Sequence, residues 1–170
     1  MNHLRFLACP IALICLHFYS PRTGVGQDKT EAVQPTELDP DKQPETDWIN
    51  ADFWQAADKN AAASSWEFVD GEIRLVQPQG GKGSLVSRPL PPNFELSFDW
   101  KIQAKTNTGL KYRVRKYGSK YYGVEYQIID DSPTAATKGS TAAIYDLSSP
   151  TAQKNLNPTG QWNTAKIVAN

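Results

Sequence analysis

Strict alternation of apolar and polar residues over 94–102 is the feature that most constrains the fold of this chain. In that segment, FELSFDWKI, every even-numbered residue is apolar and every odd-numbered residue is polar. A period of two places the apolar side chains on one face of a β-strand and the polar side chains on the other. Alternation recurs over 110–115 and in a third long segment, 122–129. The sequence therefore predicts several long strands, each with one buried face.

Turn signals separate these segments from shorter strand candidates. Asp70-Gly71 lies between two apolar runs and is typical of a tight hairpin turn, which needs positive φ at both central residues. No long amphipathic helix and no internal repeat is apparent. We therefore predict an all-β fold, an antiparallel sandwich of two sheets. The shorter strand candidates are 84–87, 142–147 and 161–169.

The first 26 residues have the pattern of a secretory signal peptide. Residues 1–5 are short and basic, and residues 6–19 are apolar apart from His17. A bilayer span needs about 20 apolar residues, so this run is too short to cross a membrane. The small residues of 24–26 place cleavage near Gln27. We expect an exported protein, periplasmic or extracellular, with no membrane contact after the signal is removed.

Both cysteines and both histidines of the chain lie in this leader, at Cys9, Cys15, His3 and His17. The mature chain would then have no disulfide, no thiolate metal site and no histidine-dependent nucleophile. Carboxylates, amides, Lys, Arg, Tyr and hydroxyl groups remain for its chemistry. We predict no metal and no cofactor; calcium, which loop carboxylates can hold, stays open but is not predicted.

An acidic, proline-containing linker over 27–46 is expected to connect the leader to a domain over 47–170. The linker has three prolines, six acidic residues and three apolar residues, too few to offset the entropy of ordering it. The whole chain has 18 basic and 18 acidic side chains. Phosphate binding needs a basic excess, so nucleic acid is excluded as the main partner. Nothing in the sequence indicates a particular oligomeric state.

Polar residues of two successive long strands are predicted to share a face. Arg113 and Glu125 lie on the polar side of their strands and would meet across the ladder if the strands pair. Gln127 would lie about 7 Å from Glu125 on the same face. An acid, an amide and a guanidinium on a curved face suit sugar hydroxyls. The alternative is an exposed salt bridge worth about 0–1 kcal/mol. A two-carboxylate glycosidase is not predicted, because the same-face neighbour of Glu125 is an amide.

Several longer motifs resemble one family, the 3-keto-disaccharide hydrolase domain family, whose members are typically exported bacterial proteins. The resemblance covers about residues 48–170, and its most specific part is GVEYQIIDD at 123–131. It implies a concanavalin A-like jelly-roll sandwich that binds carbohydrate. The other matching motifs are WEFVDGEI at 66–73, NTGLKYR at 107–113, AIYDL at 143–147 and GQWN at 160–163.

The resemblance implies hydrolysis of glycosides whose glucose unit has been oxidised to a ketone. A ketone acidifies the proton on the adjacent carbon, a carboxylate removes it, the enolate expels the glycosidic oxygen, and water then adds. Glu125 would be the base and Arg113 would stabilise the enolate. Tyr145 would donate a proton to the leaving oxygen. The implied sugar ligands are Asn107, Gln127 and Asp130.

The chain departs from the family at its end. Family domains continue past the segment matching Trp162-Asn163 with further strands, whereas this sequence stops at Asn170. We therefore expect an incomplete sandwich with an unpaired edge and an open core flank. Other functions stay open: an inactive fragment, a structural domain that packs against a partner through that edge, or a non-catalytic carbohydrate-binding module. Aromatic candidates for such a module are Tyr117, Tyr121 and Tyr122.

Overall fold

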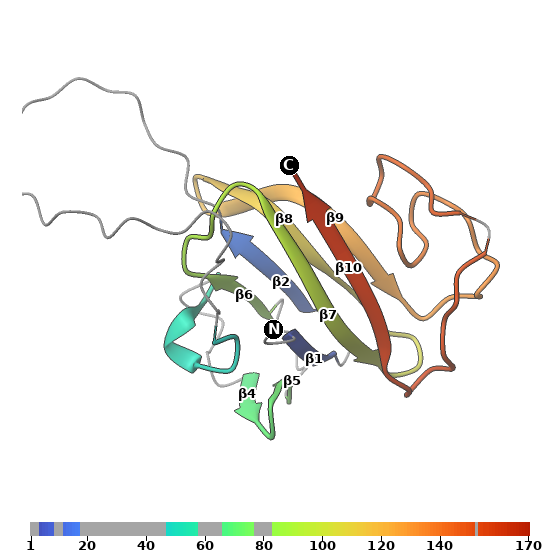
Figure 1. Ribbon diagram of the computed structural model, residues 1–170, viewed down its shortest axis with the longest axis horizontal. Helices are drawn as coiled ribbons and strands as arrows, with labels where there is room; N and C mark the ends of the chain where they lie inside the picture. Colours follow the sequence, from blue (N-terminus) through green and yellow to red (C-terminus); the bar gives the residue numbers. More distant parts are fainter. Residues whose placement is uncertain (1–3, 9–11, 18–46, 58–65, 77–82, 152) are drawn as a thin grey trace, which may run out of the picture.

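In the computed structural model, the described residues form two five-stranded β-sheets, sheet A and sheet B (Figure 1). The structure describes residues 4–8, 12–17, 47–57, 66–76, 83–151 and 153–170. A 3-10 helix, η1 (Ala51–Phe53), precedes the third strand. The strands are β1 (Leu4–Ala8), β2 (Ala12–His17), β3 (Trp54–Ala56), β4 (Trp66–Val69), β5 (Glu72–Leu75), β6 (Gly83–Ser87), β7 (Phe94–Ile102), β8 (Asn107–Tyr117), β9 (Lys120–Ile129) and β10 (Asn163–Ala169).

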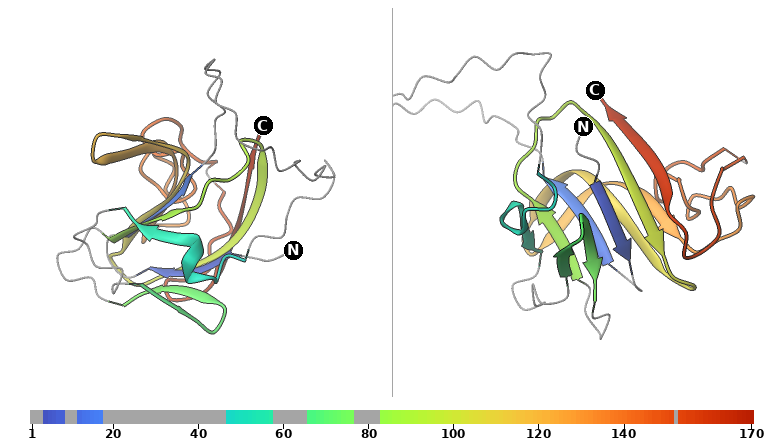
Figure 2. Two further views of the ribbon diagram at one scale, coloured as in Figure 1. Left: turned by 90° about the vertical axis from the view of Figure 1, so that its left-hand side faces the viewer. Right: turned by 60° about the horizontal axis from the view of Figure 1, so that its bottom comes forward.

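The strand order is β10-β7-β1-β5-β4 in sheet A and β3-β6-β2-β8-β9 in sheet B, and the two sheets stack as layers (Figure 2). The predicted all-β sandwich is therefore confirmed. Its pairing is mixed, however. Four pairs, β10–β7, β4–β5, β3–β6 and β8–β9, are antiparallel. β1 and β2 instead run parallel to both of their neighbours.

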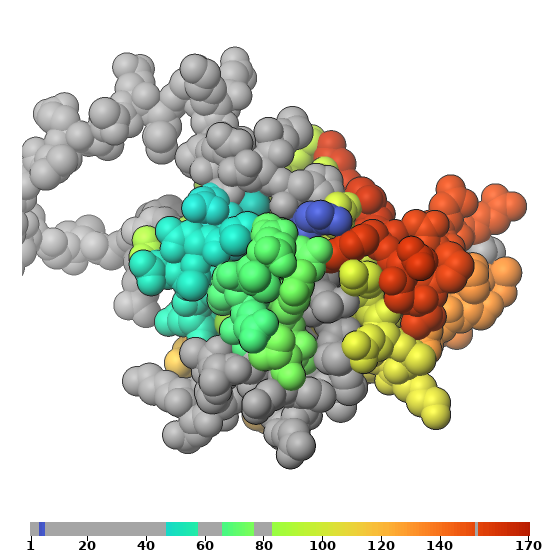
Figure 3. Space-filling view, turned by 90° about the horizontal axis from the view of Figure 1, so that it is seen from below, coloured from blue at the N-terminus to red at the C-terminus, as the bar shows by residue number. Residues whose placement is uncertain are grey.

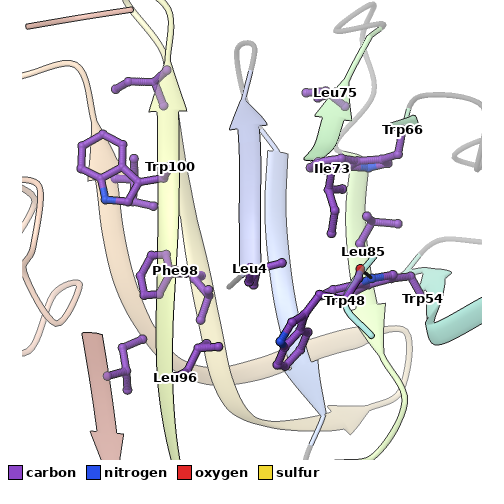
Figure 4. Packing of buried hydrophobic residues seen from close by; sticks show 14 of the residues in the cluster. Leu4, Trp48, Trp54, Trp66, Ile73, Leu75, Leu85, Leu96, Phe98 and Trp100 are labelled. Atoms are coloured by element: carbon purple, nitrogen blue, oxygen red, sulfur yellow. Dashed lines mark hydrogen bonds between the residues drawn. The ribbon is translucent and has the colours of Figure 1, made fainter. Parts of the chain in front are cut away.

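The core lies between the sheets and follows the alternation of β7 (Figure 4). Residues from sheet B that meet this strand's inner face include Leu110 and Ile128, both fully buried. The rings of Phe98 and Tyr126 join the two sheets in a T-shaped contact, with centroids 5.5 Å apart. The buried residues of β7 are those predicted from the sequence, Phe94, Leu96, Phe98, Trp100 and Ile102.

Turn chemistry accounts for the β4–β5 hairpin. Asp70 and Gly71 have φ of 54° and 73°, the left-handed values that a two-residue turn of this kind requires. The predicted hairpin is thereby confirmed. The late strand candidate corresponds to β10, whereas the candidate over 142–147 is reduced to isolated bridges of Ile144 with Tyr126 and with Ser148. Within the described residues, β10 and β4 form the edges of sheet A, and β3 and β9 those of sheet B.

Parts of the segment that the sequence assigns to a signal peptide form β1 and β2, the central strands of the two sheets. Leu4 is fully buried in the core, and the guanidinium of Arg5 lies 3.5 Å from Asp99. These contacts do not test cleavage, so the secretory signal stays a prediction. The predicted linker lies outside the described residues. No helix in the described ranges is long and apolar enough to cross a bilayer.

Truncating the ring that joins the sheets should destabilise the sandwich. Phe98→Ala is expected to lower the free energy of unfolding by about 3–5 kcal/mol, because Phe98 is fully buried. Val168→Ala on β10 is the control, since Val168 is half exposed and its truncation should cost less than about 1 kcal/mol. Urea unfolding followed by tryptophan fluorescence measures both. Equal losses in the two variants would contradict the core described above.

Candidate functional site

The β8–β9 hairpin positions the candidate site on the face of sheet B that points away from the core. Cα partners across the ladder are Lys111 and Glu125, Gly109 and Gln127, and Asn107 and Ile129. Intervening residues such as Leu110 point into the core. Period-two alternation therefore places one set of residues together on the outer face of sheet B. This set, called the outer-face cluster below, is Asn107, Gly109, Lys111, Glu125 and Gln127.

Glu125 lies across Gly109 and pairs with Lys111. The Glu125 Oε2 atom is 3.4 Å from the Lys111 Nζ, and their side chains are 16% and 22% exposed. A Cβ at position 109 would lie 2.5 Å from the Glu125 Oε1, so only glycine lets the carboxylate take this position. Burial raises the pKa of Glu125 above its usual range, and the nearby Lys111 partly opposes this effect.

Gln127 belongs to the same face. The sequence predicted that this face is solvated, but Gln127 is buried. Its Nε2 donates hydrogen bonds to the Asn107 Oδ1 at 3.2 Å and to the Gly139 carbonyl at 3.3 Å. The burial has a clear cause, because residues 139–145 fold over the free edge of β9. The Gln127 Oε1 is buried and makes no hydrogen bond within the described part of the chain. This atom is enclosed by protein and is not open to a ligand in the structure.

Main-chain hydrogen bonds hold the covering segment against β9 (Figure 1). The Gln127 amide donates to the Ala143 carbonyl at 3.0 Å, and the Tyr145 amide donates to the Glu125 carbonyl at 2.9 Å. The predicted residue Tyr145 is thus brought beside Glu125 by its backbone, with its side chain half exposed. This contact places Tyr145 at the border of the outer-face cluster.

Arg113 does not meet Glu125, contrary to the prediction. A β-bulge interrupts the ladder between Tyr112 and Arg115, and Arg113 has φ of 53°. Its Nη2 donates a hydrogen bond to the main-chain carbonyl of Asn170, at the end of β10 in the other sheet, at 2.8 Å. The bulge shifts the alternation by one residue, and Lys111 takes the position expected for Arg113.

The hairpin itself contains a signal that would have revealed the bulge. Tyr117 pairs with Lys120 at its tip. An unbroken ladder continued from this pair would place Glu125 opposite Tyr112, an ion opposite a core residue. Inserting one extra residue on β8 restores matching faces and pairs Glu125 with Lys111. On the opposing strand, the residue that faces the bulge is Gly123. A Cβ there would lie 2.7 Å from the Tyr112 carbonyl oxygen.

Asp130 lies at the end of β9 and does not join the outer-face cluster. Its Oδ1 accepts a hydrogen bond from the Thr159 hydroxyl at 2.5 Å, and its Oδ2 accepts one from the Lys105 amide at 2.7 Å. These two bonds, that from Thr159 foremost, lower the pKa of Asp130. Asp130 instead lines a separate cavity of about 310 Å³, together with Trp100 and Asn163.

A buried ion pair anchors the loop that follows β9, and sequence reasoning gave no indication of it. The Lys154 Nζ lies 3.3 Å from the Asp131 Oδ2 and donates a hydrogen bond to the Thr141 carbonyl at 3.1 Å. The Lys154 side chain is 4% exposed. Thr141 in turn bonds through its hydroxyl to the main chain of Ile129. These contacts fix the segment that covers Gln127.

Acidic, histidine and cysteine side chains do not gather in threes anywhere in the part of the chain that the structure describes. The predictions on metals and cofactors therefore stay predictions. The chemistry visible at the outer-face cluster is that of a half-buried carboxylate, an ammonium group beside it and two amides.

Removing the ammonium group tests the electrostatics of this cluster. Lys111→Met is expected to raise the pKa of Glu125 further, because burial remains while the compensating charge is lost. Side-chain ¹³C NMR titration measures this pKa, with the resonance assigned from Glu125→Gln. Lys166→Met is the matched control, since Lys166 pairs with Glu95 on sheet A. An unchanged or lower Glu125 pKa in Lys111→Met would contradict the proposed coupling.

Comparison with known proteins adds family evidence to this geometry. A curated 3-keto-disaccharide hydrolase of Bacteroides thetaiotaomicron is 30% identical over 139 residues, covering 68% of this chain and 48% of that protein. A crystal structure from Parabacteroides distasonis, provisionally described as a glycosyl hydrolase, matches with a TM-score of 0.55 and 26% identity, covering 70% of this chain and 60% of that one. This chain thus spans about half the length of the curated relative.

The family comparison covers the chain from just before η1 to Asn170, which includes every described strand except β1 and β2. The model of the 3-keto-alpha-glucoside-1,2-lyase-like domain matches residues 46–170, which include β8, β9 and the segment that covers them. The resemblance noted in the sequence motifs is thereby confirmed, and the chain belongs to the 3-keto-alpha-glucoside-1,2-lyase-like domain family.

Proposed function

We propose that this chain is a carbohydrate-active protein that cleaves 3-keto-glycosides at the outer-face cluster. The observation that carries the proposal is the Glu125–Lys111 pair, a half-buried carboxylate of raised pKa beside an ammonium group. The name of the Bacteroides relative, a 3-keto-disaccharide hydrolase, supports the substrate class. A raised pKa makes a carboxylate a stronger base near neutral pH.

The proposed reaction begins with proton transfer to Glu125. The substrate ketone acidifies the adjacent C–H bond, Glu125 takes the proton, and the electron pair of that bond forms an enolate. Collapse of the enolate breaks the neighbouring bond to the glycosidic oxygen and leaves a carbon–carbon double bond. Tyr145 is proposed to relay the proton from Glu125 to the departing oxygen. Addition of water across the double bond completes the hydrolysis.

Lys111 replaces Arg113 in this scheme as the cation that stabilises the enolate. Its ammonium is already oriented at Glu125, so a negative charge that develops on a substrate beside Glu125 lies within its field. Asn107 is the proposed sugar ligand, and the buried Gln127 holds its side chain through the Nε2–Oδ1 hydrogen bond. Arg113 and Asp130 are left out of the chemical steps, because their side chains are engaged by Asn170 and by Thr159 and Lys105.

Substitution of the base gives the direct test. Glu125→Gln is expected to lower turnover of a 3-keto-glucoside by at least about 100-fold, the usual lower range for losing a general base. Glu95→Gln, at an exposed glutamate paired with Lys166, is the control and should retain activity. A substrate deuterated at the carbon next to the ketone should react more slowly in the unaltered protein. Full activity of Glu125→Gln would remove Glu125 from the mechanism.

The pH dependence follows from the state in which Glu125 acts. A base must be ionised, so kcat/KM should rise with pH through the Glu125 pKa. Because burial raises this pKa, the rise should be centred above the 4.5 of an ordinary glutamate. Initial rates at low substrate concentration, measured from about pH 4 to 8, locate the pH at which kcat/KM rises. A profile that is level across this range would argue against a carboxylate base.

A carbohydrate-binding module without catalysis is the second candidate. Tyr117 and Tyr122 are 64% and 55% exposed at the tip of the β8–β9 hairpin, and their rings meet edge to face at 6.0 Å. Exposed aromatic rings of this kind can stack on sugars. Tyr121, the third candidate, packs instead against Val86 and Val114. Incubation with a 3-keto-glucoside distinguishes the candidates. Turnover indicates an enzyme, binding without turnover indicates a binding module, and the absence of both indicates a structural domain.

Export to the periplasm or the extracellular space is part of the same proposal. It is supported by the composition of residues 1–26. Cell fractionation followed by N-terminal sequencing of the exported protein tests it, and the expected new N-terminus lies near Gln27.

A further inference from the structure

Glu125 lies in the middle of a row of three side chains on the outer face of sheet B, with Lys111 as its partner across the β8–β9 ladder. On the other side of β9, Tyr126 and Ile144 form an antiparallel bridge. The Tyr145 amide donates to the Glu125 carbonyl at 2.9 Å. Alternation across this bridge directs the Tyr145 side chain to the face that carries Glu125. The carboxylate therefore has an ammonium group on one side and a phenol on the other.

A tight turn follows the row, in the part of the chain after β9 that forms one end of the molecular surface (Figure 3). This segment, called the 144–148 turn below, is closed by two main-chain hydrogen bonds between Ile144 and Ser148, at 3.0 and 2.9 Å. Asp146 has φ of 60°, and its amide donates to the Lys138 carbonyl at 3.0 Å. Ile144 and Leu147 are nevertheless 40% and 67% exposed. Apolar side chains that a fixed turn holds in solvent beside a polar site are typical of a ligand-binding surface.

The reacting atoms of the proposed substrate have the same order as this row. A 3-keto-glucoside carries its ketone at carbon 3, the acidic hydrogen at carbon 2 and the glycosidic oxygen at carbon 1. The ketone oxygen, which becomes the enolate, fits beside Lys111, and the hydrogen at carbon 2 fits beside Glu125. The glycosidic oxygen then faces Tyr145, the proposed proton relay. The group attached to that oxygen must therefore extend past Tyr145, over the 144–148 turn.

We propose that the 144–148 turn binds the leaving group, and that Ile144 and Leu147 favour substrates whose leaving group is apolar, such as an alkylphenol. The inference rests on the proposed function and assigns the part of the substrate that this function leaves open. An alkylphenyl group that covers the two side chains removes apolar surface of both partners from water. The name of the Bacteroides relative denotes a disaccharide substrate for that protein. A sugar leaving group would gain less at this turn, because its hydroxyls would lose water against apolar atoms.

The test compares two aryl substrates whose leaving oxygens have similar acidity, so that the chemical step is matched. They are the 3-keto-glucosides of 4-propylphenol and of 4-(hydroxymethyl)phenol, which differ in apolar surface. The kcat/KM is expected to be about 10-fold higher for the propyl substrate, mainly through a lower KM, which is the usual size of apolar discrimination. Equal kcat/KM values would overturn the inference. A higher kcat/KM for a 3-keto-disaccharide than for the propyl substrate would also overturn it.

A substitution at the exposed tip makes the test specific to the turn. Leu147→Asn is expected to reduce the ratio of the two kcat/KM values to about 2-fold or less, because the apolar contact is lost. Val168→Asn is the matched control, since Val168 is 53% exposed on β10 of the other sheet, and it should keep the ratio. An unchanged ratio in Leu147→Asn would contradict the assignment of the leaving group to this turn.

A binding measurement separates this inference from the proposed function. Isothermal titration calorimetry of the Glu125→Gln variant gives a Kd for each aryl substrate without turnover. A Kd about 10-fold lower for the propyl compound, with this preference lost when Leu147→Asn is added, supports the inference. This result would stand even if the unaltered protein hydrolysed neither compound, which would count against the proposed function alone. Equal Kd values for the two compounds would overturn the inference whether or not turnover is seen.

Discussion

Pairing between β8 and β9 fixes the position of the site side chains, and the bulge at Arg113 determines which residues take part. Below the bulge, Lys111 and Glu125 share the outer face of sheet B, while Leu110 points into the core. At the bulge the alternation changes, and Arg113 reaches the end of β10 in the other sheet. One extra residue in a strand therefore exchanges a guanidinium for an ammonium group as the partner of the carboxylate.

The environments of Glu125 and Asp130 shift the pKa values of their carboxyl groups in opposite directions. Glu125 lies half buried over Gly109, and burial raises its pKa. Asp130 accepts hydrogen bonds from Thr159 and Lys105, which lower its pKa and stabilise the ionised form. Groups whose environments separate their pKa values in this way serve different roles. The raised pKa of Glu125 is consistent with the base proposed above, whereas the hydrogen bonds of Asp130 connect the end of β9 to two loops.

Sequence reasoning succeeded where one physical constraint acts alone. Alternation on β7 and the turn chemistry of Asp70-Gly71 are local, and both correspond to the structure. It failed where two segments distant in sequence meet. Gln127 has the parity of a solvated residue, yet residues 139–145 bury it through contacts that no local pattern encodes. The bulge becomes predictable only when the alternation of β8 and that of β9 are compared across the ladder that the two strands form.

The N-terminal segment shows why an apolar run is ambiguous. Short continuous apolar runs are typical of buried central strands. The apolar part of a secretory signal has the same composition, and residues 6–19 fit both descriptions. The two uses differ in when they act. Export requires the run before the chain folds, whereas the positions beside β7 and β8 exist only after the sheets have formed. Composition cannot separate these uses, because both depend on the transfer of the same apolar surface out of water.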